Sequence, residues 1–179
     1  FPKRLEDNGA HHFGEISYPG IEIPGKGPQQ EYLEDIFVGY RWHDTKKIPA
    51  LFPFGHGLSY TAFKYGKATL SSKEMSDNGT ITVTVPVTNT GDVDGKETVQ
   101  LYIQDEKSSL PRPVKELKGF RKIHLAPGQT TEVSFSITPD DLKFFDDSKH
   151  EWIAEPGKFK AMIGASSTDI RSTVRFSYK

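Results

Sequence analysis

Carboxylates and histidines are the residues of this chain whose side chains could do chemistry. The sequence holds 24 Asp and Glu and 6 His but no Cys, which excludes a thiolate nucleophile, a thiolate metal site and a disulfide framework. Carboxylate pairs could serve as a general acid and base, and three closely spaced pairs are Asp92/Asp94, Asp140/Asp141 and Asp146/Asp147. Each pair lies among turn-forming residues, where a solvated Asp is the ordinary case. We therefore expect no catalytic residue within this chain.

The histidines do not have the spacing of a metal site. His11 and His12 are adjacent, whereas His43 and His56 are isolated, and no helical or hairpin ligand set results. The segment 92–95 has some likeness to a calcium loop, but the position of its bidentate acid is occupied by Leu101. There is also no Gly-rich phosphate loop. We expect no metal and no cofactor.

Composition and charge narrow the choice of partners. The chain has 179 residues, a formal net charge of -1, 35% hydrophobic and 26% charged residues, as expected for a folded globular chain. The near-zero charge gives no field to attract nucleic acid or an acidic membrane surface, and no apolar run approaches the ~20 residues of a bilayer span. The start at Phe1 shows neither an initiator Met nor a leader, so we expect it to be internal to a longer polypeptide.

From residue 61 onward the sequence is typical of an all-β fold. In residues 81–87 Ile and Val alternate with Thr and Pro, which predicts a strand with one face on a core. We expect three hairpins, a single helical turn at 139–142, and an aromatic pair of segments, 144–145 and 152–153, around a polar turn. The hairpins join 81–87 with 99–103, 117–125 with 133–137, and 159–163 with 174–178.

Residues 1–60 are different in composition. They hold half of the Gly and half of the Pro, and the stretch 19–28 is too broken for a helix or a central strand. The β-branched and aromatic residues of 36–42 predict one strand there, which would need sheet partners. Around Gly55 and Gly57, residues 52–60 are rich in aromatic rings and predict a compact packing anchor between two bodies.

Several blocks together resemble the C-terminal end of family 3 glycoside hydrolases, the family of β-glucosidases and β-xylosidases. The first blocks are Ile36–Arg41, Asp44-Thr45 and Leu51–Thr61, and the later ones are Asn89–Gly91, Gly95, Val99–Tyr102, Arg112–Phe120, Leu125–Gly128, Glu155–Gly157 and Ile163-Gly164. The likeness covers nearly the whole chain. One departure is Trp42-His43, where two tyrosines would be expected, so a contact made there would be particular to this protein.

The resemblance implies an immunoglobulin or fibronectin type III-like β-sandwich of about seven strands at 61–179, preceded by an irregular N-terminal extension. Residues 1–60 would then be the end of an α/β sandwich domain plus a linker. The whole enzyme would hydrolyse β-glycosides with retention, using two carboxylates that the family carries on other domains. This chain would brace those domains, which would be its partners. The resemblance also favours a periplasmic or secreted location.

The resemblance also suggests roles for particular side chains. An interdomain anchor would consist of Phe52, Phe54, His56 and Tyr60, and Trp42 and His43 could border the substrate. A free-standing carbohydrate-binding module stays open as an alternative, because aromatic rings stack on pyranose faces. Its candidate rings are Trp152 and Tyr102.

Overall fold

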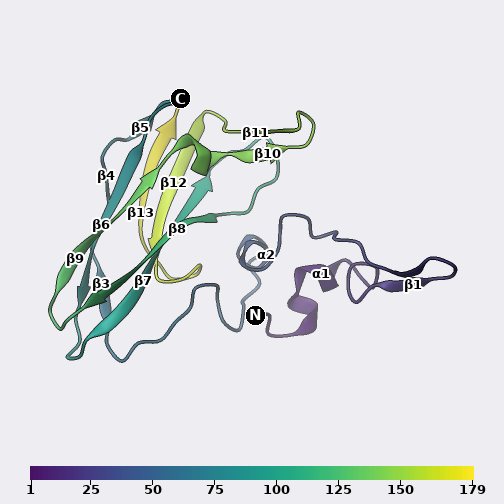
Figure 1. Cartoon of the computed structure of the whole chain (residues 1–179), viewed down its shortest axis with the longest axis horizontal. Coiled ribbons are helices and arrows are strands. Elements are labelled where there is room, and N and C mark those ends of the chain that lie inside the picture. The colour runs from purple at the N-terminus through teal and green to yellow at the C-terminus, as the bar shows by residue number, and fades with distance from the viewer.

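Strands predominate in the computed structural model, which describes residues 1–179 (Figure 1). The six long strands are β6 (Ile81–Asn89), β7 (Gly95–Asp105), β8 (Glu116–Leu125), β9 (Thr130–Ile137), β12 (Gly157–Gly164) and β13 (Ile170–Tyr178). The short strands are β1 (Ile21–Ile23), β2 (Gly27–Gln29), β3 (Phe63–Tyr65), β4 (Thr69–Leu70), β5 (Glu74–Met75), β10 (Phe144–Asp146) and β11 (Glu151–Ile153). The helices are η1 (Leu5–Asp7), α1 (Gly9–His12), α2 (Tyr40–Lys46) and η2 (Pro139–Leu142). None of them has the length and apolar character that crossing a bilayer requires.

Two sheets contain all the long strands. One has the order β5-β13-β12-β7-β8, and in the other β6 pairs with β9 on one edge and with β3 and β4 on the opposite edge. The two remaining pairs, β1-β2 and β10-β11, are separate hairpins. The inward-facing positions of both sheets are apolar. Their side chains therefore pack together into one core of 19 buried residues.

The alternation in β6 produces this arrangement directly. Its odd-numbered residues are buried and its even-numbered ones half-buried along the whole strand, as a period of two requires. The same period places apolar side chains of the facing strands on that core: Val133, Phe135 and Ile137 of β9, Leu101 and Ile103 of β7, and Phe159, Ala161 and Ile163 of β12.

The strand pairing corrects two of the three expected hairpins. β6 and β7 lie in different sheets, as do β8 and β9, because β7 pairs with β8 and β6 pairs with β9. The turns at 90–94 and 126–129 therefore pass from one sheet to the other. The third hairpin, β12 with β13, is confirmed, as are the pair β10-β11 and the helical turn η2.

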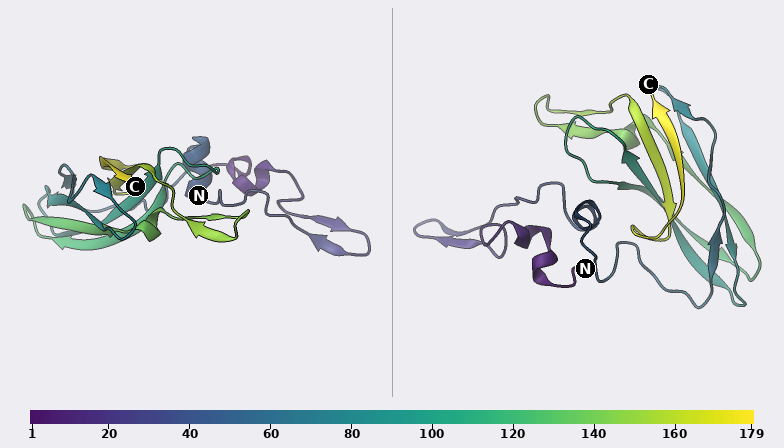
Figure 2. Two further views of the ribbon diagram at one scale, coloured as in Figure 1. Left: turned by 90° about the horizontal axis from the view of Figure 1, so that it is seen from above. Right: turned by 180° about the vertical axis from the view of Figure 1, so that it is seen from behind.

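The N-terminal segment, defined here as residues 1–60, extends to one side of the two sheets. Figure 2 shows η1, α1 and the β1-β2 hairpin well away from the sheets, and α2 lies between them and the core-forming strands. The segment contains no strand of either main sheet. Its position beside the sheets therefore depends on α2 and on the connection that follows it.

The strand expected at residues 36–42 is wrong. Residues 36–39 are irregular, and α2 begins at Tyr40 after Gly39, whose φ is 61°. The helix ends at Lys47, which adopts a left-handed conformation while its N–H bonds to the carbonyl of His43. The strand prediction rested on the β-branched and aromatic residue types alone. It overlooked that the polar residues Arg41 and Thr45 are four positions apart, which places them on one face of a helix.

Candidate functional site

Helix α2 is the structural junction between the N-terminal segment and the sheets. Residues three and four apart share a face of a helix, and here one face, with Tyr40, Arg41, Asp44 and Thr45, makes contacts with the start of β8. The other face carries Trp42. Each face thus serves a different part of the chain.

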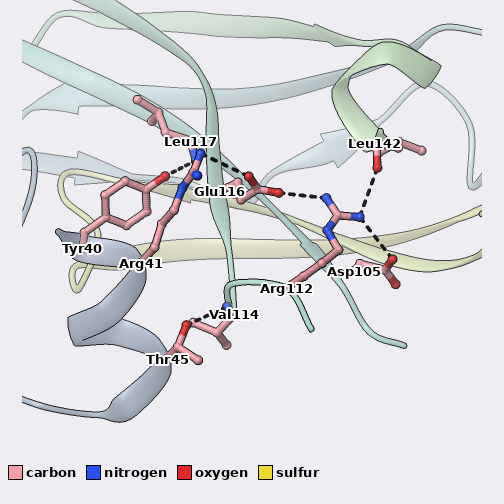
Figure 3. A network of polar contacts seen from close by, with 9 residues as sticks. All are labelled: Tyr40, Arg41, Thr45, Asp105, Arg112, Val114, Glu116, Leu117 and Leu142. Carbon is pink, nitrogen blue, oxygen red and sulfur yellow. Dashed lines mark hydrogen bonds and ion pairs between the residues drawn. The ribbon is translucent and has the colours of Figure 1, made fainter. Parts of the chain in front are cut away.

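Two backbone groups beside β8 are held by side chains of α2 (Figure 3). The N–H of Leu117 donates a hydrogen bond of 2.8 Å to the hydroxyl oxygen of Tyr40, and the N–H of Val114 donates one of 3.1 Å to Thr45. The first of these bonds is partly buried and the second is exposed, and each satisfies a backbone donor. The helix therefore completes the hydrogen bonding of this stretch.

A nearly buried ion pair adds to this contact. Lys115 Nζ lies 2.8 Å from Asp44 Oδ2, and the two side chains are only 10% and 7% exposed. The same carboxylate oxygen has no aligned hydrogen-bond donor, so the ammonium charge alone compensates it. Leaving one partner without the other would place an unpaired charge in a poorly solvated position.

Arg112 forms the centre of a second polar group (Figure 3). Its guanidinium donates to Glu116 at 2.8 Å, to Asp105 at 3.3 Å and to the carbonyl of Leu142 at 3.1 Å. Glu116 also lies 3.2 Å from Arg41 of α2. The network thereby joins α2, the ends of two strands and the η2 helix.

The charge of Glu116 is favoured in this setting. Burial by itself would raise the pKa of Glu116, but the hydrogen bond from Arg112 and the positive charges of Lys118, Arg112 and Arg41 lower it below its ordinary value of 4.5. The carboxylate form is therefore part of what holds α2 on β8.

Trp42 and His43, expected at a substrate border, are both buried. Trp42 is 2% exposed, and its indole N–H donates to the carbonyl of Asp7 at 3.1 Å. Its ring packs against those of His12 and Phe13. His43 bonds through Nδ1 to the carbonyl of Ile48. In this chain Trp42 thus holds residues 7–13 onto α2, whereas His43 fixes the residues that follow the helix.

The four anchor residues expected at 52–60 lie on an exposed strap, defined as residues 51–60. Phe52, Phe54, His56 and Tyr60 are all exposed, and Tyr60 reaches 102%. Phe52 stacks on His56 and Phe54 on Tyr40. Their rings thus form part of the chain surface instead of a closed packing cluster.

The backbone of the strap is nevertheless fixed. Gln100, buried in β7, donates through Nε2 to the carbonyls of Gly55 and Ala165 at 3.2 and 2.7 Å. Tyr102 donates to Gln100 Oε1 at 2.6 Å, and the N–H of Ser167 bonds to the carbonyl of Phe54. Tyr102 itself is fully buried, which removes it as a ring for stacking on a sugar.

A cavity of about 950 Å³ lies between α2, the strap and the loop at 165–170. Polar groups in its wall include His43, Asp44, Lys115 and Ser167, and apolar ones include Trp42 and Phe54. The hydroxyl oxygen of Ser167 is buried and has no hydrogen-bond partner. The cavity is thus part of the same junction.

Most exposed large apolar side chains lie in the N-terminal segment, which is only a third of the chain. They are Phe1, Leu5, Phe13, Tyr18, Tyr32, Leu33, Ile36, Val38, Leu51, Phe52, Phe54, Leu58 and Tyr60. The rest of the chain has Val93, Leu110, Val114, Phe120, Phe145 and Trp152. An excess of exposed apolar side chains in one segment is typical of a surface that contacts another body.

The carboxylate pairs and histidines form no obvious reaction centre. Asp140 pairs with Lys143, Asp146 with Lys149, and Asp94 with His124. No group of three or more His, Asp or Glu residues is placed to hold a metal ion.

Sequence reasoning missed Asp44, Lys115, Glu116 and Arg112 as junction residues. Their partners lie far apart along the chain, since Asp44 and Lys115 are joined only by the fold. No spacing rule covers such a pair. The available signal was the charged stretch 112–118 itself, which follows Pro111 and contains opposite charges side by side.

Comparison with known proteins shows which proteins this chain is similar to. A fibronectin type III-like domain matches residues 97–167. The chain is 59% identical over 178 residues to the beta-glucosidase BoGH3A of Bacteroides ovatus, covering 99% of this chain and 23% of the relative.

Solved structures agree with the sequence match. A GH3 beta-glucosidase of Bifidobacterium adolescentis superposes with a TM-score of 0.86 at 33% identity, covering 99% of this chain and 25% of that one. Beta-glucosidase 3B of Thermotoga neapolitana in complex with glucose gives 0.84 at 37% identity, over 99% of this chain and 23% of that one. This chain spans about a quarter of the length of these relatives. Over nearly all of its length the chain is thus similar to part of these GH3 beta-glucosidases, and residues 97–167 of it match a fibronectin type III-like domain.

Proposed function

We propose that this chain is the C-terminal accessory part of a β-glycoside hydrolase and that it braces the catalytic domains of the same enzyme. The observation that carries the proposal is the junction: a segment rich in exposed apolar side chains is fixed at the start of β8 by the pairs Asp44–Lys115 and Arg41–Glu116. A rigid support with an apolar outer surface suits docking and not turnover.

The fold we propose is a fibronectin type III-like β-sandwich of about seven strands. β3 and β4 pair with successive parts of the same edge of β6, so they count as one interrupted strand beside the six long ones. Two sheets over one core, antiparallel except for the short β5-β13 pair, with connections that pass between them, support this fold.

The domain division we propose places residues 1–60 with the end of the preceding α/β sandwich domain and residues 61–179 with the β-sandwich. The first main-sheet strand, β3, begins at Phe63, just after this boundary. The strap would then be the passage from one domain to the other.

The exposed rings of Phe52, Phe54, His56 and Tyr60 are our proposed interdomain anchor. Trp42 and His43 are buried within the N-terminal segment, so a role at the substrate border would act through the residues that they position, Asp7 and Ile48. The whole enzyme would act as a β-glucosidase or β-xylosidase, with both catalytic carboxylates outside this chain.

The test compares the purified chain with the gene product that includes the residues preceding Phe1. We expect turnover of aryl β-glucosides or β-xylosides by the longer polypeptide and none above background by the chain alone. Turnover by the chain alone, abolished by one carboxylate substitution, would contradict the proposal.

A free-standing carbohydrate-binding module is the second candidate, and exposed Trp152 is the observation that favours it. Affinity electrophoresis of the chain on soluble β-glucan separates the two. Clear retardation that is lost in Trp152→Ala would support the module.

A further inference from the structure

The β10-β11 hairpin has two unlike faces. Phe144 and Asp146 of β10 are buried, whereas Phe145 and Trp152 are 42% and 65% exposed. Phe145 and Trp152 are register partners, with ring centroids 5.7 Å apart. The hairpin therefore presents an aromatic pair to solvent while its other face is held by the chain.

The inner face is fixed to the junction network. The guanidinium of Arg112 lies 5.1 Å from the ring centroid of Phe144 and donates to the carbonyl of Leu142 just before the hairpin. The same guanidinium bonds Glu116, which contacts α2 through Arg41. The hairpin and the N-terminal segment are thus positioned by one set of contacts.

Both elements project from the same side of the sheets. Figure 1 shows the hairpin and the N-terminal segment extending in the same direction, and Figure 2 shows this from two further sides. A body in contact with the N-terminal segment would lie beside the hairpin. An isolated two-stranded hairpin is marginal in water, and an exposed aromatic pair on it gains by burial.

We propose that the outer face of the β10-β11 hairpin, with Phe145 and Trp152, is a second docking contact with the globular part of the parent enzyme that covers the N-terminal segment. This rests on the proposed function. The relatives extend far beyond the length of this chain, which supplies a body large enough to reach both contacts. The polar tip at 147–150 would form the rim of the interface.

The geometry favours a protein surface over a sugar. The two rings meet at 63°, so they form a wedge and not a flat platform on which successive pyranose faces could stack. A wedge of two rings fits a pocket between side chains, as aromatic anchors at interfaces do.

The test is amide hydrogen exchange in the full-length enzyme and in the 179-residue chain. We expect residues 144–153 to exchange about tenfold or more slowly in the full-length enzyme than in the lone chain. The turn at 90–94, at the end of β6 that pairs with β3, should be unchanged.

A full-length variant Phe145→Ser/Trp152→Ser should lose this protection, whereas Val93→Ser, which also removes an exposed apolar side chain, should keep it. The melting temperature of the lone chain should be the same for both variants, which excludes a general folding defect.

Each other outcome decides against the proposal in its own way. Protection of the N-terminal segment without protection of the hairpin would overturn the second contact and leave the proposed function standing. Protection of neither would overturn both. Hairpin protection that appears only with added soluble β-glucan, or only at high protein concentration, would assign the face to a carbohydrate or to a second copy of the chain.

Discussion

Lys115→Met should weaken the junction, because it leaves the nearly buried Asp44 carboxylate with no compensating charge. The two groups lie 2.8 Å apart and are 10% and 7% exposed. Removing one member of a buried ion pair costs about 3–5 kcal/mol. Both side chains sit near the edge of the junction cavity, where water reaches more easily, so we expect about 3 kcal/mol.

Asp44→Asn should cost less than Lys115→Met. The Lys115 side chain is long and can turn its ammonium group toward water when its partner is lost, whereas Asp44 is held on α2 by a short side chain. The double variant should be less damaged than the sum of the two single variants, with a coupling of about 2 kcal/mol.

The assay is urea unfolding of the four chains in a Trp152→Phe background. Trp42 is then the only Trp, and its buried indole, bonded to Asp7, reports on the junction through its fluorescence. Circular dichroism of the same samples follows the sheets. If the coupling is below about 0.3 kcal/mol, or if Lys115→Met leaves the Trp42 transition unchanged, the ion pair does not hold the junction.

Three further predictions concern other parts of the same junction. The folded-state pKa of Glu116 is lowered below its ordinary 4.5, so its stabilising contribution is present above pH 4.5 and is lost as the pH falls through the folded pKa; the stability gap between wild type and Glu116→Gln, measured by urea midpoints, should therefore be constant above pH 4.5 and narrow below it. Gly55→Ala should lower the melting temperature, because Gly55 has a φ of +78° and a Cβ there would overlap the Gln100 amide, whereas Gly57→Ala, which meets nothing within 4 Å, should not; equal melting of the two variants would refute the fixed strap. Phe54 is 47% exposed, so Phe54→Ala should cost the lone chain well under the ~3–5 kcal/mol of a buried Phe yet lower the activity of the full-length enzyme, and an unchanged enzyme would remove its anchor role.

The strands of the two sheets were predictable because their apolar period of two is strong. In β6 the buried residues alternate without interruption, and the end hairpin of β12 with β13 is joined by a short polar turn. Which strands pair was not predictable from the turns alone. The turn at 126–129 has the residues of a hairpin turn, yet it passes between sheets: β9 pairs with β6, in which every second residue is buried, and not with β8, in which only Leu125 is buried.

The helix α2 was not predictable from residue types because its stability is tertiary. A seven-residue helix is marginal alone, and Tyr40 and Trp42 have no strong helical preference. What fixes it is the combination of Asp44 with Lys115 on one side and Trp42 with Asp7 on the other. Those partners are distant in sequence, and no local pattern announces them.

The strap shows why exposure and order must be considered together. Leu58 and Tyr60 are 93% and 102% exposed, which by itself would be compatible with a flexible linker. The backbone at Gly55, three residues before Leu58 and five before Tyr60, is however bonded to Gln100, and the carbonyl of Phe54 accepts from the N–H of Ser167. Holding apolar rings in a fixed arrangement before contact lowers the ordering cost of association. An ordered backbone that carries exposed rings is therefore better explained as a docking surface formed in advance than as a tether between domains.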